Sequence, residues 1–393
     1  MIRRRNEVNL RADSSPAHQV GSPRISQTID PRGSYLAYCC GCPGAVDHDS
    51  NPMNITVILC TYQRCNSLKK ALQSVAGSVL PSAVEWEVLV VDNNSTDGTP
   101  QVVEEFSRRY PGRFRYLFEP KPGKSFALNS GIREAHGDVL AFMDDDVTVE
   151  PTWLQKLTAV LESDDWAGIG GRILPEQDFT PPRWLSLSGP HDAAPLALWE
   201  RGLTAMSLFE PPFGTNMAFK RRVFEQYGGF RTDLGPRPDS KDPQKSEDSE
   251  FSRRLLAGGE RLYYEPAAVV YHPVLEERVC KQYFLRWWFD KSRAEVRVAG
   301  IRPGTKWFFQ GVPLYMYRRF VFWVAMWMVA WKPATRFSNK LKVWRKAGEI
   351  VEAYRQAHKG KQNAQEEVRW PIQAASSLPA GTMSHGQRTT SER

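Results

Sequence analysis

Asp138-Val139-Leu140-Ala141-Phe142-Met143-Asp144-Asp145-Asp146-Val147 is the stretch around which the chain is organised. A short apolar run between polar residues predicts a buried strand. Three adjacent carboxylates at its end cannot all stay ionised in one pocket without a counter-charge. A divalent cation with oxygen ligands, which also holds phosphate oxygens, is the natural partner. A solvated acidic loop is the alternative interpretation.

Composition narrows the classes of partner. The chain has 393 residues, a hydrophobic fraction of 41% and a net charge of +8, which fits a packed protein whose basic surface could meet anionic lipids or phosphorylated substrates. No strand alternates basic and aromatic residues, so we expect no nucleic-acid partner. Cys39 and Cys42 have metal-ligand spacing but no second matching pair, which disfavours zinc. The cysteine pattern favours a reducing compartment, and the chain start resembles no signal peptide, so we expect a cytoplasmic protein.

Strands and helices are expected to alternate after residue 53. Residues 1–53, rich in Ser, Pro, Gly and Arg, are expected to be a disordered basic arm. Apolar runs predict strands at 54–60, 86–91 and 114–118 before the acidic strand. Helices are expected between them, with Asn66, Thr99 and Pro151 at their starts. This order predicts an α/β fold with a mostly parallel, Rossmann-like sheet and helices on both faces.

Three of these strands end in polar residues, at Thr61-Tyr62, at Asp92-Asn93 and at Asp144-Asp145-Asp146. In such sheets ligands bind at the carboxyl ends of the strands, so we expect one pocket there. The chain has neither the glycine-rich dinucleotide fingerprint nor a Walker phosphate loop. Phosphates must therefore be held by a metal and side chains, which argues against dehydrogenases and ATPases.

Five segments together resemble the family 2 glycosyltransferases, which have the GT-A fold. They are Cys60–Arg64, Val91–Gly98, Gly123–Asn129, Asp144–Asp146 and Glu247–Phe251. The resemblance runs from residue 54 to residue 272. It implies an inverting, metal-dependent enzyme that moves a sugar from a nucleotide-diphosphate donor to an acceptor hydroxyl, in polysaccharide or glycolipid assembly.

The resemblance also implies roles on the donor side. Residues at the ends of the first two strands border the nucleobase and ribose, with Tyr62 placed to stack on the base. Many relatives carry Asp where this chain has Asn93, whose amide oxygen is a weaker acceptor than a carboxylate. A UDP-sugar is therefore only a first guess for the donor. The residues implied in donor binding are Thr61, Tyr62, Asp92, Asn93, Lys124, Asp144 and Asp145.

Metal and base residues follow from the same resemblance. Asp144 and Asp146 are the outer pair of the DxD motif and would hold Mn²⁺ or Mg²⁺, with Asp146 as the direct ligand. His272 is either structural or a further metal ligand. Asp248 would be the general base, with Glu247 in reserve. The alternative is that these acids only complement the dipole of a helix capped by Ser246.

The remaining segments concern the acceptor. Gly214–Phe219 is either a turn that lines the acceptor side or an ordinary hairpin. Gln282, Arg286 and Trp287 resemble the QxxRW motif of processive relatives, but one extra residue separates Gln from Arg, so that role is not carried over. We expect the catalytic domain at 54–275, a helical extension at 276–359 and a disordered tail at 360–393.

The apolar part of the helical extension, Phe320–Trp331, is too short to span a bilayer, which takes about twenty residues. A basic helix follows it, at Arg336–His358. Aromatic segments beside basic ones predict a helix lying in the membrane interface, at the inner face of the cell membrane, where it would meet a lipid-linked acceptor. A helical subdomain packed on the catalytic core is the alternative.

Two other functions fit parts of the sequence. One is a catalytically silent scaffold that binds nucleotide sugars in a polysaccharide assembly complex, although the intact acidic motifs argue against it. The other is a sugar-phosphate nucleotidylyltransferase, which needs a Gly-x-Gly-Thr-Arg loop after the first strand. Thr61-Tyr62-Gln63-Arg64 stands there instead.

Overall fold

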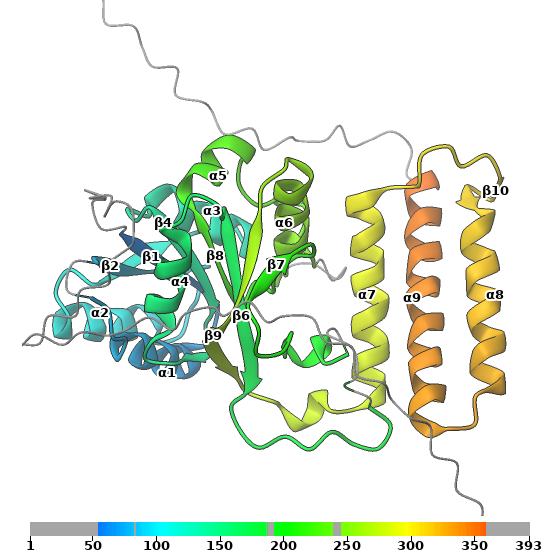
Figure 1. Ribbon diagram of the computed structural model, residues 1–393, viewed down its shortest axis with the longest axis horizontal. Helices are drawn as coiled ribbons and strands as arrows, with labels where there is room; N and C mark the ends of the chain where they lie inside the picture. Colours follow the sequence, from blue (N-terminus) through cyan, green and yellow to red (C-terminus); the bar gives the residue numbers. More distant parts are fainter. Residues whose placement is uncertain (1–53, 82–83, 186, 188–191, 239–244, 359–393) are drawn as a thin grey trace, which may run out of the picture. The chain divides into compact units, whose positions relative to one another are not determined.

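Four parallel strands form one half of the central sheet (Figure 1). The computed structural model describes residues 54–81, 84–185, 187, 192–238 and 245–358. The strands lie in the order β3-β2-β1-β4, and the register sets Thr61 beside Asp92 and Cys60 beside Asp144. Their carboxyl ends therefore meet at one edge. The bounds are β1 Ile55–Thr61, β2 Trp86–Asp92, β3 Phe114–Phe118 and β4 Val139–Asp144.

Helices cover both faces of these strands because both faces are apolar. In β4, Val139 to Met143 are all buried. Helices α1 and α2 pack on each other, whereas α3 packs on β1 and β2. Right-handed crossovers place α3 on the opposite face, since the chain reverses direction across the sheet to reach β4. The expected fold class is confirmed. The bounds are α1 Cys65–Ala76, α2 Thr99–Arg109, α3 Lys124–Glu134 and α4 Trp153–Leu161.

The other half of the sheet brings later parts of the chain beside the acidic strand. Strand β8 pairs antiparallel with β4, with Asn216 opposite Met143. Strand β9 pairs with β5, which follows the acidic triplet, and ends at His272. The elements of this half are β5 Thr148–Val149, β6 Gly168–Pro175, η1 Ala194–Leu196, β7 Met206–Leu208, β8 Asn216–Lys220, α5 Arg221–Tyr227, α6 Glu247–Ala257 and β9 Leu262–His272.

Three expected helix starts are wrong. Asp97, rather than Asn66 or Thr99, binds the first N–H groups of both α1 and α2. Its carboxylate accepts from the Cys65 N–H at 2.9 Å and from the Thr99 N–H at 3.1 Å. Helix α4 begins two residues after Pro151. A fourth expectation fails in detail, since Ser246 precedes α6 but its buried hydroxyl has no hydrogen-bond partner. Its backbone there is left-handed, with φ of 81°.

Three long helices follow the sheet, and α9 packs against both α7 and α8 (Figure 1). In the described ranges, no helix is both long and apolar enough to cross a membrane. The expected arm at 1–53, the tail at 360–393 and the pair Cys39 and Cys42 lie outside the described residues. The bounds are η2 Glu276–Arg278, α7 Lys281–Ala299, β10 Phe308–Phe309, β11 Val312–Pro313, α8 Leu314–Val329 and α9 Pro333–His358.

Candidate active site

A cavity of about 860 Å³ opens at the carboxyl ends of the parallel strands. Side chains from β1, β4, α3, α6 and β9 line it, together with residues of α7 and α9. All but one of the residues predicted for the site line this cavity. They are Thr61, Tyr62, Asn93, Lys124, Asp144, Asp145, Asp146, Glu247, Asp248 and His272.

Asp92 is the exception. Its carboxylate is fully buried, accepts from the Ser95 N–H at 2.8 Å and from the Tyr116 hydroxyl at 2.9 Å, and does not line the cavity. Asn93 does line the cavity, but its side-chain amide is hydrogen-bonded to the loop before α3. It donates to the carbonyls of Glu119 and Lys121 and accepts from the Gly123 N–H at 2.7 Å. A contact with a nucleobase would use the second lone pair of Oδ1.

Cations compensate the acidic triplet. Lys124 Nζ contacts Asp144, whose second oxygen accepts from the Thr215 hydroxyl at 2.8 Å. Burial lowers the pKa of Lys124, but the charges of Asp144 and Glu247 outweigh burial and leave that pKa raised. Burial raises the pKa of Asp145 to about 6, although Arg64 lies 3.1 Å away and opposes the shift.

Asp146 faces His272 across the cavity floor. Asp146 Oδ1 lies 3.7 Å from His272 Nε2, and its Oδ2 accepts from Arg64 at 2.8 Å. The His272 ring is buried and its Nδ1 has no hydrogen-bond partner. Burial lowers the pKa of His272 despite the charges of Asp146 and Asp144, which favours the neutral imidazole that a metal requires.

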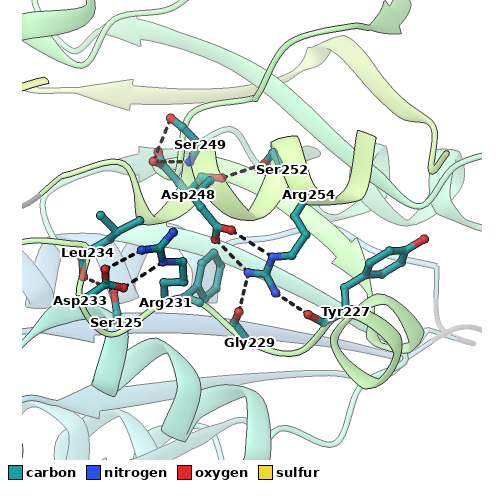
Figure 2. A network of polar contacts seen from close by, with 12 residues as sticks. Ser125, Tyr227, Gly229, Arg231, Asp233, Leu234, Asp248, Ser249, Ser252 and Arg254 are labelled. Atoms are coloured by element: carbon teal, nitrogen blue, oxygen red, sulfur yellow. Dashed lines mark hydrogen bonds and ion pairs between the residues drawn. The ribbon is translucent and has the colours of Figure 1, made fainter. Parts of the chain in front are cut away.

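The acids at the start of α6 lie on the same cavity. Asp248 Oδ2 accepts from the Gly214 N–H at 3.0 Å. Its Oδ1 accepts from the Ser249 N–H at 2.6 Å (Figure 2), so both oxygens are held in place. Glu247 is buried, and burial together with the neighbouring Asp248 charge raises its pKa to about 7. Arg254 anchors this helix, because it pairs with Glu250 at 2.9 Å and donates to the Gly229 carbonyl at 2.8 Å.

Aromatic packing fixes α6 relative to the acidic strand. Phe251 of α6 stacks on Phe224 of α5 with ring centroids 4.7 Å apart. Phe230 contacts Phe251 on one side and Phe142 of β4 on the other, at 5.0 and 5.5 Å. This apolar cluster holds the base candidates and the triplet at one rim, although more than a hundred residues separate them in sequence.

Sequence reasoning missed several cavity residues. Arg64 bonds to both Asp145 and Asp146, and its position three residues after the first strand was a usable signal. Thr215 belongs to the segment Gly214–Phe219, for which the sequence allowed two interpretations, an ordinary hairpin or a turn that lines the acceptor side. A further wall of the cavity, which we call the α7 wall, was given no role, although one of its residues, Trp287, belongs to the segment that resembles QxxRW. It consists of Lys245, Trp287, Trp288, Lys291 and Arg345, all of which line the cavity.

Comparisons with known proteins identify relatives of this chain. The family model described as glycosyl transferase family 2 matches residues 56–228. The succinoglycan biosynthesis protein ExoM of Rhizobium meliloti is 27% identical over 227 residues, which cover 58% of this chain and 69% of that protein. The glucosyl-dolichyl phosphate glucuronosyltransferase of Haloferax volcanii is 30% identical over 235 residues, which cover 58% of this chain and 71% of that protein.

Among solved structures, the mannosyltransferase PcManGT from Pyrobaculum calidifontis in complex with GDP-Man and Mn²⁺ is 21% identical, with a TM-score of 0.47. The match covers 79% of this chain and 77% of that one. The match to the Haloferax protein spans more than two thirds of its length and, with the family model, decides the assignment. The chain belongs to glycosyltransferase family 2 and is a glycosyltransferase of glycan or glycolipid biosynthesis.

Proposed function

We propose that the chain transfers a sugar, with inversion, from a nucleotide-diphosphate donor to an acceptor hydroxyl, and that a divalent metal is required. The observation that carries the proposal is the meeting of Asp146 and His272 with Asp248 and Glu247 in one cavity. The acids that follow β4 and begin α6, and the histidine that ends β9, have no common packing reason to converge on one cavity. A shared reaction accounts for their convergence.

The residues fit a divalent cation. Two ligands of one Mg²⁺ or Mn²⁺ ion each lie about 2.1 Å from it, so they can be up to about 4.2 Å apart, and Asp146 and His272 are 3.7 Å apart. Within the described ranges no group of three His, Cys, Asp or Glu side chains could hold a metal alone. Further ligands would come from water and the donor diphosphate, as is usual for Mg²⁺. A bound cation would stabilise the negative charge of the departing diphosphate.

Asp248 is the base in this proposal. It takes the proton of the acceptor hydroxyl as that oxygen forms a bond to the anomeric carbon, while the bond from carbon to the diphosphate oxygen breaks and its electron pair leaves with the diphosphate. The fixed carboxylate of Asp248 keeps a lone pair for the acceptor, since two N–H groups and the Ser249 hydroxyl occupy only part of its capacity. Glu247 stays the reserve candidate.

The test combines turnover and binding. Asp146→Ala and Asp248→Ala should each lower transfer and donor hydrolysis by about 10³-fold, as expected for loss of charge stabilisation or of a general base, while circular dichroism shows folded protein. Asp165→Ala, an exposed carboxylate away from the cavity, is the control. A thermal-shift panel of nucleoside diphosphates with and without Mn²⁺ identifies the nucleobase of the donor. Metal-dependent binding without turnover on any glycan or lipid acceptor would instead support the silent scaffold.

The proposal extends to the membrane. Helix α8 exposes apolar side chains, among them Val329 at 71%, and Trp331, two residues after the helix, is 84% exposed. The same helix carries the exposed Arg318 and Arg319. An apolar helix face with adjacent basic residues fits the interface of an anionic bilayer. We propose that this surface attaches the enzyme to the membrane that carries its acceptor.

Vesicle co-sedimentation tests the attachment. The full chain should bind phosphatidylglycerol-containing vesicles, and Val329→Ser with Trp331→Ser should weaken that binding about tenfold or more, since each large apolar side chain contributes roughly 1.5–3 kcal/mol when buried. Leu203→Ser, which removes another exposed apolar side chain, is the matched control. Equal sedimentation of all three proteins would contradict the attachment.

A further inference from the structure

The α7 wall carries cations that lie on indole rings. Lys245 Nζ is 4.8 Å from the Trp287 ring centroid, and the Arg345 guanidinium is 4.3 Å from that of Trp288. Lys291 Nζ donates to the Ser249 hydroxyl at 3.0 Å. An indole face attracts a cation but does not neutralise it. The wall therefore presents positive charge to the cavity at fixed positions.

These cations lack the carboxylate partners that the acidic triplet provides to Lys124 and Arg64. In the described part of the chain, neither Lys245 nor Lys291 has a carboxylate within ion-pair distance of its Nζ. Arg345 has only Glu295, at 3.9 Å, and its buried Nε has no hydrogen-bond partner. The charges of Asp290 and Glu247 act on Lys245, but neither carboxylate forms an ion pair with it. Cations held in a partly buried place without a paired carboxylate favour an anionic ligand.

Burial of Lys245 adds to the preference of this wall for an anionic ligand. Burial lowers the pKa of Lys245 to about 8; the charge of Asp290 opposes the shift, and the charge of Lys291 adds to it. The two ammonium groups therefore repel each other. An anion placed between them would relieve that repulsion and restore the lysine charge.

The wall also adjoins the proposed base. Lys291 touches Ser249, the residue after Asp248, whereas Asp146 and His272 lie at the ends of β4 and β9. Resting on the proposed function, we infer that the α7 wall binds an anionic group of the acceptor, a phosphate or a carboxylate, and so presents the acceptor hydroxyl to Asp248. The acceptor would then be a sugar phosphate linked to a lipid or an acidic glycan, and not a neutral sugar.

Calorimetry on the full chain in EDTA tests the inference with two probe pairs. One pair is farnesyl phosphate and farnesol, and the other is methyl glucuronide and methyl glucoside. We expect at least tenfold tighter binding of one charged probe than of its neutral twin, and weakening of that binding by added salt. The pair that shows the difference identifies the group as phosphate or carboxylate.

Variants locate the binding. Lys245→Met with Lys291→Met should reduce affinity for the charged probe at least tenfold, and Lys291→Arg should retain it. Lys342→Met, which removes a lysine 4.1 Å from the Trp323 ring outside the cavity, should stay within twofold of the unaltered chain. Thermal melts establish that each variant is folded.

Other outcomes overturn the inference. Equal binding of charged and neutral probes, or unchanged binding by the folded double variant, would remove the α7 wall as an anion site. Binding that needs Mn²⁺ and is lost in Asp146→Ala would assign the anion to the donor diphosphate. If probe binding persists in Asp146→Ala while no nucleotide binds the unaltered chain, the metal-dependent donor reaction fails and the α7 wall stands.

Discussion

The two ends of the cavity treat positive charge in opposite ways. At the strand ends Lys124 lies against Asp144, and Arg64 bridges Asp145 and Asp146. At the α7 wall the cations lie on tryptophan rings or a serine hydroxyl. The first end is an internally compensated network that a metal or a diphosphate would have to rearrange. At the second end, the positive charges have no paired carboxylate and would be balanced by a bound anion.

This difference has energetic consequences. Removing one partner of a buried ion pair leaves the other charge without compensation, which costs several kcal/mol. Removing a cation that has no partner leaves nothing behind and can relieve repulsion. The same change, lysine to methionine, should therefore have different results at the two ends of one cavity.

The largest effect on stability is expected at the strand ends. Lys124→Met should destabilise the fold by about 2–4 kcal/mol, because Asp144 keeps only the Thr215 hydroxyl. Lys291→Met should change stability by less than about 1 kcal/mol. Urea unfolding in EDTA measures both, and Lys69→Met, which breaks an exposed pair with Glu105, controls for loss of a surface charge. Equal destabilisation by Lys124→Met and Lys291→Met would contradict the proposed difference in charge compensation between the two ends of the cavity.

A smaller effect should depend on pH. The Glu247 carboxyl has a pKa raised to about 7 in the fold, so the folded chain binds its proton more tightly than the unfolded chain does. Stability should then fall as pH rises from about 4.5 to 7, the interval between the two values. Glu247→Gln should remove this loss and raise the unfolding free energy at pH 8 by about 2 kcal/mol or less, with the gain fading towards pH 5.

Glu260 provides the opposite control. Arg222 bonds both of its oxygens, at 2.7 and 2.9 Å, and lowers its pKa. Stability from this carboxylate is present at neutral pH and lost as pH falls through the folded pKa. Glu260→Gln should thus lower thermal stability at pH 8. A gain there for Glu260→Gln, or a loss for Glu247→Gln, would contradict this account of the two carboxyls.

Local patterns predicted most of the elements but few of their ends. Apolar runs located β1 to β4 to within a residue or two, because burial on both faces demands continuous apolar residues. Helix starts were harder. Asp97 serves α1 and α2 from a loop between the second strand and the second helix, and a partner 32 residues distant from Cys65 leaves no local signal.

The sequence by itself determined the parallel half of the sheet, the family and the set of acidic residues, because strand ends and motif order depend on residues that are consecutive in the chain. Tertiary structure decided which of those acids are compensated. It also buried Asp92 outside the cavity, brought His272 to Asp146 and built the α7 wall. Each of these depends on contacts between residues far apart in the chain, where packing of β9, α7 and α9 sets the distances and burial sets the charge.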